Sequence, residues 1–174
     1  MPDLRRYEGE KVDILFDAKR CIHAGKCVGG LRSVFNPDGR PWINADEASA
    51  DEIAEVIHKC PTEALSYERK DGGPAEVAQA EVSLAVDKNG PIFVRGTIDL
   101  RDHAGEPIQV GPRAALCRCG ASKNKPFCDK HAMFLNSGEE FTAPKRIVIG
   151  KNDTPYIHIR QGVTDWKRGK VFVP

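Results

Sequence analysis

Residues 117–131 read Cys-Arg-Cys-Gly-Ala-Ser-Lys-Asn-Lys-Pro-Phe-Cys-Asp-Lys-His. The segment holds three cysteines and one histidine, separated by basic and polar residues and without apolar periodicity. Such neighbours argue against cysteines that merely fill a core. Four soft ligands on one short loop can surround a metal ion or an iron–sulfur cluster without ligands from distant chain. The segment therefore predicts a metal or cluster site.

The segment resembles the CDGSH iron–sulfur domain. That family's pattern is Cys-x-Cys, two residues, Ser or Thr, three residues, then Pro-x-Cys-Asp-Gly-Ser-His. The matching residues in this chain are Cys117, Cys119, Ser122, Pro126, Cys128, Asp129 and His131. The resemblance implies a β-rich domain with a 2Fe–2S cluster bound by three thiolates and an imidazole, from Cys117, Cys119, Cys128 and His131.

Two further residues take supporting roles by their position in the family pattern. The hydroxyl of Ser122 would donate a hydrogen bond toward a cluster sulfur, and Asp129 would cap a helix that carries His131. The family has three residues between its last cysteine and its histidine, whereas this chain has only Asp129 and Lys130 there. His131 can therefore be the fourth ligand only if the loop tightens by one residue.

A structural zinc site competes with the cluster, because zinc accepts a tetrahedral set of three cysteines and one histidine. The Cys-x-Cys spacing of Cys117 and Cys119 is tight for two ligands of one tetrahedral ion, and this favours the cluster.

A second set of cysteines lies upstream, at Cys21, Cys27 and Cys60, the last of them followed by Pro61. The surrounding sequence resembles the divergent mono-cluster ferredoxin family, with Ala24 where single-cluster ferredoxins carry a middle cysteine. The resemblance implies a 3Fe–4S cluster, or a 4Fe–4S cluster whose remaining iron is bound by water, His23 or His58. The alternative is that these cysteines are core thiols, since Cys60 continues the apolar face of a predicted helix.

The chain has 174 residues, 40% apolar and 29% charged, with a net charge of +1. This composition is typical of globular proteins and offers no overall field for nucleic acid. The N-terminus has no secretory signal, and no apolar run approaches the roughly 18 residues of a membrane span. We therefore expect a cytoplasmic protein whose six cysteines are ligands rather than disulfides.

Local patterns predict an α+β protein of two domains, residues 1–72 and 73–174, divided at Gly72-Gly73-Pro74. In the first domain we expect a strand over 12–16 and a helix that begins at the capping box of Ser49 and ends before Pro61. In the second we expect a hairpin at Asn89-Gly90. The strands predicted there are 82–86, 92–94, 97–100, 146–149, 156–159 and 171–173.

The resemblances imply a small ferredoxin-like domain followed by a CDGSH domain, and a function in one-electron transfer to a redox partner protein. The alternative is an iron–sulfur cluster carrier that serves an apo acceptor, or a redox or pH sensor. A third hypothesis is a zinc-stabilised interaction module. We expect no enzymatic activity, because no nucleophile–base pair or nucleotide fingerprint is present. CDGSH proteins with one motif are often homodimers, so a homodimer is expected unless the first domain replaces the partner.

Overall fold

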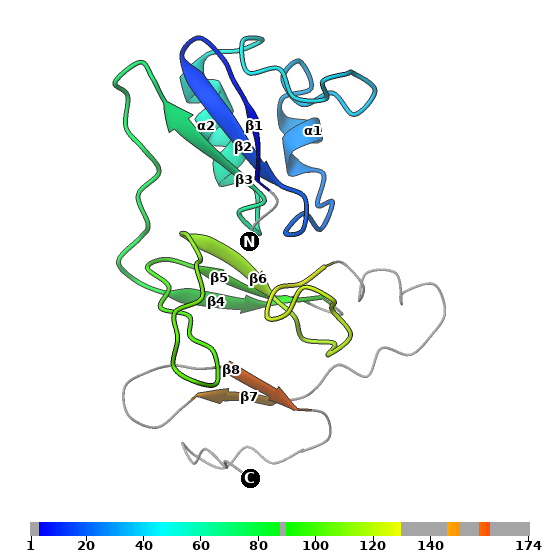
Figure 1. The fold of residues 1–174 in the computed structure, drawn as a ribbon, viewed down its shortest axis with the longest axis vertical. Coiled ribbons are helices and arrows are strands. Elements are labelled where there is room, and N and C mark those ends of the chain that lie inside the picture. Colours follow the sequence, from blue (N-terminus) through cyan, green and yellow to red (C-terminus); the bar gives the residue numbers. More distant parts are fainter. Residues whose placement is uncertain (1–3, 88–89, 130–145, 150–156, 161–174) are drawn as a thin grey trace. The chain divides into compact units, whose positions relative to one another are not determined.

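The computed structural model describes residues 4–87, 90–129, 146–149 and 157–160 (Figure 1). The chain divides into two units, Met1–Ala78 and Gln79–Pro174. The division falls in the same irregular segment as the Gly72–Gly73 pair that predicted a boundary.

The N-terminal unit is built on an antiparallel sheet with strand order β1-β2-β3. Its strands are β1 (Leu4–Tyr7), β2 (Val12–Asp17) and β3 (Leu65–Arg69). Between β2 and β3 the chain forms the short helix α1 (Lys26–Gly30) and the longer helix α2 (Ala50–His58). The predicted strand over 12–16 and the helix that begins after Ser49 are thereby confirmed.

The capping box that predicted α2 is present in full. The Ser49 hydroxyl accepts from the Glu52 backbone N–H at 3.3 Å, and the Glu52 carboxylate accepts from the Ser49 backbone N–H at 3.0 Å. Two of the orphan donors at the helix start are satisfied in this way. The helix ends at His58 with Lys59 as its C-cap, so the next turn delivers Cys60 and Pro61 to the end of the unit's core.

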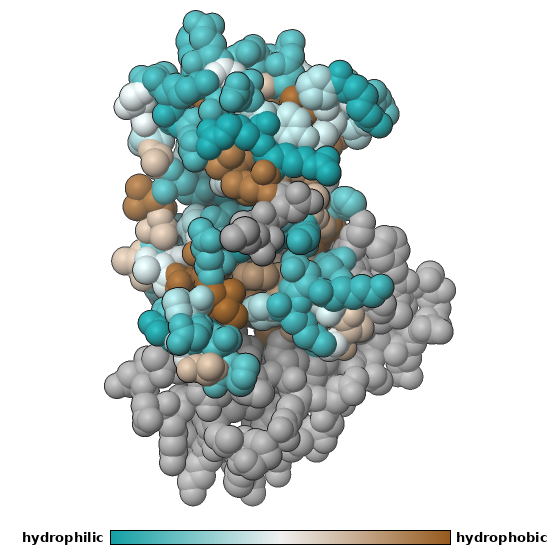
Figure 2. Space-filling view, viewed as in Figure 1, coloured by the Kyte–Doolittle hydropathy of each residue, from teal (hydrophilic) through white to brown (hydrophobic). Residues whose placement is uncertain are grey.

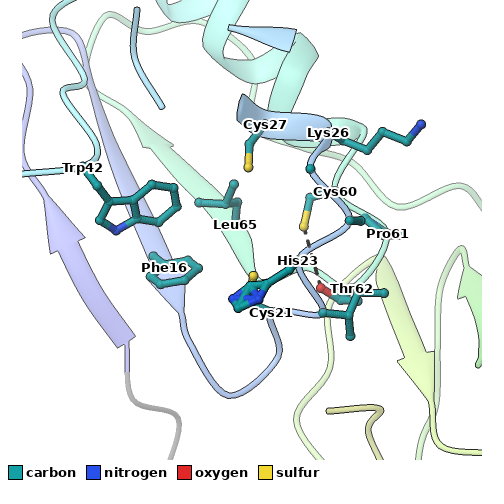
Figure 3. A pocket seen from close by; sticks show the side chains of 13 residues that line it. Phe16, Cys21, His23, Lys26, Cys27, Trp42, Cys60, Pro61, Thr62 and Leu65 are labelled. Carbon is teal, nitrogen blue, oxygen red and sulfur yellow. Dashed lines mark hydrogen bonds between the residues drawn. The ribbon is translucent and has the colours of Figure 1, made fainter. Parts of the chain in front are cut away.

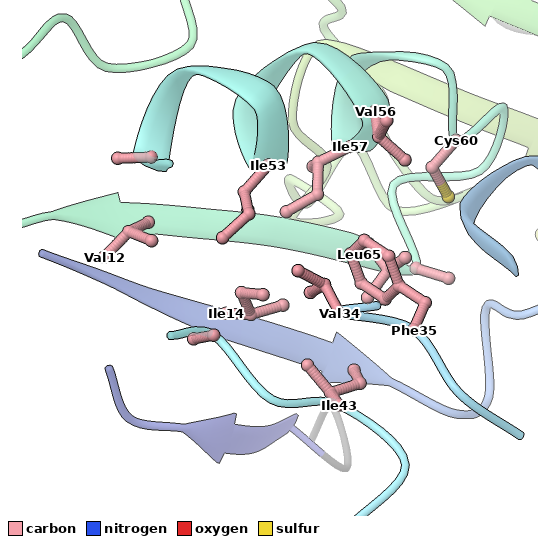
Figure 4. Packing of buried hydrophobic residues seen from close by; sticks show 13 residues of the cluster. Val12, Ile14, Val34, Phe35, Ile43, Ile53, Val56, Ile57, Cys60 and Leu65 are labelled. Atoms are coloured by element: carbon pink, nitrogen blue, oxygen red, sulfur yellow. The ribbon is translucent and has the colours of Figure 1, made fainter. Parts of the chain in front are cut away.

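One face of the sheet is buried under α2 (Figure 4). Ile14 on β2, Ile53 and Ile57 on α2 and Phe35 in the connecting loop are all 0% exposed. Cys60 belongs to this cluster, while Cys21 and Cys27 pack against its margin. Packing against this core therefore positions the three segments that carry Cys21, Cys27 and Cys60.

Asp13 on β2 is a buried carboxylate, 6% exposed, and accepts hydrogen bonds from Lys70, Arg6 and the backbone of Gly9. The Lys70 and Arg6 side chains lower its pKa from 3.8 to about 2. Because the pKa is lower in the folded state, Asp13 stabilises the fold above about pH 4, and this contribution is lost as the pH falls toward 2.

We therefore expect Asp13→Asn to flatten the acid side of the stability curve. Urea unfolding followed by circular dichroism at pH 7, 4 and 2.5 measures this. Parent and variant curves that fall in parallel between pH 4 and 2.5 would show that Asp13 is not the group responsible.

The C-terminal unit contains an antiparallel sheet of order β4-β5-β6. Its strands are β4 (Ser83–Val86), β5 (Ile92–Arg95) and β6 (Arg113–Leu116). The predicted hairpin is confirmed, since β4 and β5 pair from Val86 and Ile92 outward. A second, two-stranded sheet pairs β7 (Arg146–Ile149) with β8 (Ile157–Arg160), close to two predicted strands. The strand predicted over 171–173 lies outside the described residues.

The strand predicted over 97–100 is wrong. Gly96 has φ 118°, a conformation that an L side chain rarely adopts, and it turns the chain out of β5. Beyond it the backbone makes isolated contacts, from Thr97 N–H to the Gln79 carbonyl and from Ile108 N–H to the Leu100 carbonyl, both 2.8 Å. The third strand of the sheet is β6, which the sequence did not reveal.

The edge strand β4 is exposed along its whole length. Its apolar side chains Leu84 and Val86 are each about half exposed. By contrast, the N-terminal unit presents mostly hydrophilic side chains on the face that Figure 2 shows. No described helix is long and apolar enough to cross a membrane.

Candidate metal centres

Cys21, Cys27 and Cys60 line one pocket of the N-terminal unit (Figure 3). They arrive from three segments: the turn after β2, the first turn of α1, and the residues after α2. Figure 3 shows their sulfur atoms facing the space between these segments. The fold thus brings together three cysteines that the sequence separates by up to 39 positions, counted from Cys21 to Cys60.

The loop from Cys21 to Cys27 bends sharply to make this approach. His23 has φ 55° and Gly25, the N-cap of α1, has φ 71°. Gly30 at the other end of α1 lies against α2, because a Cβ there would come within 3.2 Å of the Val56 side chain. A glycine at position 30 lets α1 approach α2 closely, and this places Cys27 near Cys60.

All six cysteines are present as thiols rather than disulfides. Burial raises the pKa of Cys27, and the neighbouring thiolates of Cys60 and Cys21 raise it further. A metal that binds here must displace the protons and supply compensating positive charge. Cys21 and Cys60 therefore lie close enough to Cys27 to disfavour its thiolate.

The pocket has an apolar wall and one buried hydroxyl. Phe16 and Trp42 meet edge to face with ring centroids 4.9 Å apart, and Leu65 continues the wall. Trp42 thus packs against the core and also forms part of the pocket wall. On the other side Thr62, 3% exposed, places its hydroxyl oxygen 3.7 Å from the Cys60 sulfur and accepts from the Ala64 N–H at 3.3 Å.

The two histidines expected as alternatives for a fourth ligand have different surroundings. His23 lines the pocket. His58 is exposed at the end of α2, where its Nε2 lies 3.0 Å from the Tyr67 hydroxyl, and it does not line the pocket.

The CDGSH-like segment continues β6. The Cys117 N–H donates to the Pro126 carbonyl and the Cys128 N–H to the Ala115 carbonyl, both at 2.8 Å, around a bridge between Leu116 and Phe127. In this antiparallel register Cys117 and Cys128 lie on the same face, diagonally opposed. Backbone pairing therefore brings the first and last cysteines of the motif together.

The third cysteine is held beside the first. The sulfurs of Cys117 and Cys119 are 3.7 Å apart, and Gly120 with φ 77° makes the turn that follows. Two thiolates on one tetrahedral metal with bonds of about 2.3 Å would be about 3.8 Å apart. The Cys-x-Cys spacing is therefore compatible with one tetrahedral ion as well as with a cluster, so the preference for a cluster over zinc stays a prediction.

Ser122 and Asp129 organise the loop between the cysteines. The Ser122 hydroxyl donates to the Phe127 carbonyl at 2.7 Å and accepts from the Asn124 N–H at 3.0 Å. Its single proton is thus directed at a backbone carbonyl within the loop, and its expected bond toward a cluster sulfur stays a prediction. Asp129 accepts from the Lys123 N–H at 2.8 Å and closes the loop; the helix that it was expected to cap lies outside the described residues.

His131 also lies outside the described residues, as does Lys130. Of the basic residues around the motif, Arg118 donates to the backbone carbonyls of Gly90 and Asp87, at 3.0 and 2.8 Å, and so fastens the β4–β5 loop to the motif. Lys123 and Lys125 are exposed. In the described part of the chain, no three Cys, His, Asp or Glu side chains are arranged as around a single metal ion.

Two family models match the chain in the order of the two sites. Residues 7–70 match the divergent 4Fe-4S mono-cluster model, and residues 89–131 match the iron-binding zinc finger of CDGSH type. The uncharacterized protein YjdI of Escherichia coli strain K12 is 42% identical over 66 residues, which are 38% of this chain and 87% of that protein. The chain belongs to the divergent 4Fe-4S mono-cluster family and carries a CDGSH-type domain after it.

YjdI of Escherichia coli O157:H7 shows the same identity and coverage. The first match spans Cys21, Cys27 and Cys60, and the second ends at His131. No solved structure matches the chain. The ferredoxin-like fold expected for the first domain therefore stays a prediction.

Proposed function

We propose that this iron–sulfur protein carries two clusters and transfers single electrons between partner proteins. The observation that carries the proposal is the meeting of Cys21, Cys27 and Cys60 in one pocket. Three thiols from separate segments, against an apolar wall and without a disulfide, fit the donor set of an iron–sulfur cluster. Cysteines that only fill a core would not need to line one pocket together.

The two sites would hold clusters of different kinds. The three thiolates of the N-terminal pocket suit a 4Fe–4S or 3Fe–4S cluster, and Cys117, Cys119, Cys128 and His131 suit a 2Fe–2S cluster. A bound cluster supplies reversible one-electron chemistry. An imidazole ligand adds less negative charge than a thiolate and raises the potential, so the two sites would differ in potential. The chain would accept an electron at one cluster and donate it from the other.

Two features of the surface fit a protein that binds protein partners. The exposed lysines Lys123 and Lys125 would offer an acidic redox partner a basic rim beside the C-terminal site. The exposed edge strand β4 supports the homodimer that the CDGSH resemblance implies. We place this activity in the cytoplasm and propose no catalysed reaction.

Redox titration of the full chain, purified without oxygen and followed by visible absorption, tests the function. Electron transfer predicts reversible reduction at two potentials with no loss of iron through repeated cycles. Release of the C-terminal cluster on reduction, together with its appearance in an apo ferredoxin, would replace electron transfer by cluster delivery.

Thr62 gives a separate prediction. Its oxygen already accepts from the Ala64 N–H, so its single proton is available for the Cys60 sulfur, which has none as a bound thiolate. A hydrogen bond to the thiolate stabilises the more negative, reduced cluster. Thr62→Val should shift the reduction equilibrium about tenfold toward the oxidised state, or about 59 mV for one electron.

The control for this prediction is Thr62→Ser, which keeps the hydroxyl and should keep the potential. Equal potentials for the valine and serine variants, with the same iron content, would show that the hydroxyl does not act on the cluster.

A further inference from the structure

Three thiolates leave the fourth iron of a 4Fe–4S cluster without a protein ligand. The polar side chains that line the N-terminal pocket, besides the cysteines, are those of His23, Lys26, Trp42 and Thr62. A lysine ammonium and an indole N–H have no lone pair to give a metal. The Thr62 hydroxyl, 3.7 Å from the Cys60 sulfur, is a hard neutral oxygen and a poorer donor for iron–sulfur clusters than an imidazole. His23 alone among these lining residues offers a neutral donor that transition metals prefer.

The backbone conformation of His23 places its side chain at the pocket. Its φ of 55° lies in the left-handed region, which residues other than glycine seldom adopt. The bend sets the imidazole two residues after Cys21, at the exposed mouth of the same pocket. Glu63 has the same φ of 55° without lining the pocket, so the bend brings His23 to the pocket but does not by itself mark a ligand.

Other nearby donors are placed differently. His58 contacts the Tyr67 hydroxyl and lies outside the pocket lining. The carboxylates of Asp17 and Glu63 pair with Arg20, at 3.6 and 3.3 Å, and do not line the pocket.

We infer that His23 is the fourth ligand of a 4Fe–4S cluster in the pocket formed by Cys21, Cys27 and Cys60. The inference rests on the proposed function, because it presupposes a cluster there. A neutral imidazole in place of a thiolate would raise the potential above that of an all-cysteine cluster. Because His23 lies at the exposed mouth of the pocket, the iron that it would bind would be the one nearest to solvent.

The test uses the full chain, reconstituted without oxygen, as parent, His23→Ala and the matched control His58→Ala. Iron and sulfide are counted, and electron paramagnetic resonance is recorded on the oxidised protein, where a 2Fe–2S cluster is silent. We expect His23→Ala to lose about one iron per chain and to show a 3Fe–4S signal. Parent and His58→Ala should keep about four irons at this site and show no such signal.

A second variant, His23→Cys, tests whether the iron lost from His23→Ala reflects a missing ligand rather than an unfolded chain. His23→Cys should keep about four irons at this site and lower the potential of its cluster. A His23→Ala chain with the iron count and spectrum of the parent, or a His23→Cys chain with an unchanged potential, would overturn the assignment and leave water as the fourth ligand. A parent with a three-iron cluster would overturn it too. A parent without iron and sulfide in the pocket would instead refute the proposed function.

Discussion

Cys128→Ser is expected to remove the C-terminal cluster, about two irons per chain, and to leave the N-terminal cluster in place. Cys128 is 3% exposed and shares a face with Cys117, so its loss removes a proposed ligand at a position that solvent reaches poorly. A serine oxygen is a harder donor than a thiolate and binds iron–sulfur clusters poorly. Iron and sulfide analysis with visible absorption measures the loss.

Lys123→Ala is the matched control, because the Lys123 side chain is exposed and its only bond in the loop is made by its backbone N–H, which the variant keeps. It should retain full iron. If Cys128→Ser also retained full iron, the CDGSH-type segment would not bind a cluster through Cys128.

Cys27→Ala is expected to have the largest effect, the loss of about three or four irons from the N-terminal pocket. The sulfur of Cys27 faces those of Cys21 and Cys60, and two remaining thiolates would be too few for the cluster. The 2Fe–2S absorption should persist, since the CDGSH motif is untouched. Iron content of the anaerobically reconstituted protein checks the result.

Val28→Ala controls for packing, because Val28 is the next residue of α1, is half-buried and has no donor atom in its side chain. It should lower stability without lowering iron content. If Cys27→Ala instead kept its iron and only lost stability, Cys21, Cys27 and Cys60 would be core thiols, the alternative that their sequence left open.

The sequence predicted elements whose signals are local. The capping box of Ser49 and Glu52 gave the start of α2, and the Asn89-Gly90 turn gave the β4–β5 hairpin. The strands β1 and β6 carry no comparable signal. The side chains of β1 are almost all exposed, and those of β6, Arg-Ala-Ala-Leu, are all buried, so neither alternates. Their place is set by pairing with β2 and β5, which only the tertiary structure shows.

The site residues divide in the same way. Spacing and flanking residues selected the cysteines as candidate ligands, and the structure brings three of them, Cys21, Cys27 and Cys60, to one pocket. The sequence patterns did not show that the Ser122 proton is used by the Phe127 carbonyl, or that Thr62 contacts Cys60. Nor did they separate His23 from His58, because only the structure shows that His23 lines the pocket while His58 contacts Tyr67 outside it.

The central claim is that both sites hold iron–sulfur clusters, and counting iron, zinc and acid-labile sulfide per chain, on protein purified without oxygen, tests it most directly. We expect about five or six irons per chain with matching sulfide and no zinc. About one zinc per site, with no sulfide, from cells grown with ample iron would contradict it and leave a zinc-stabilised module.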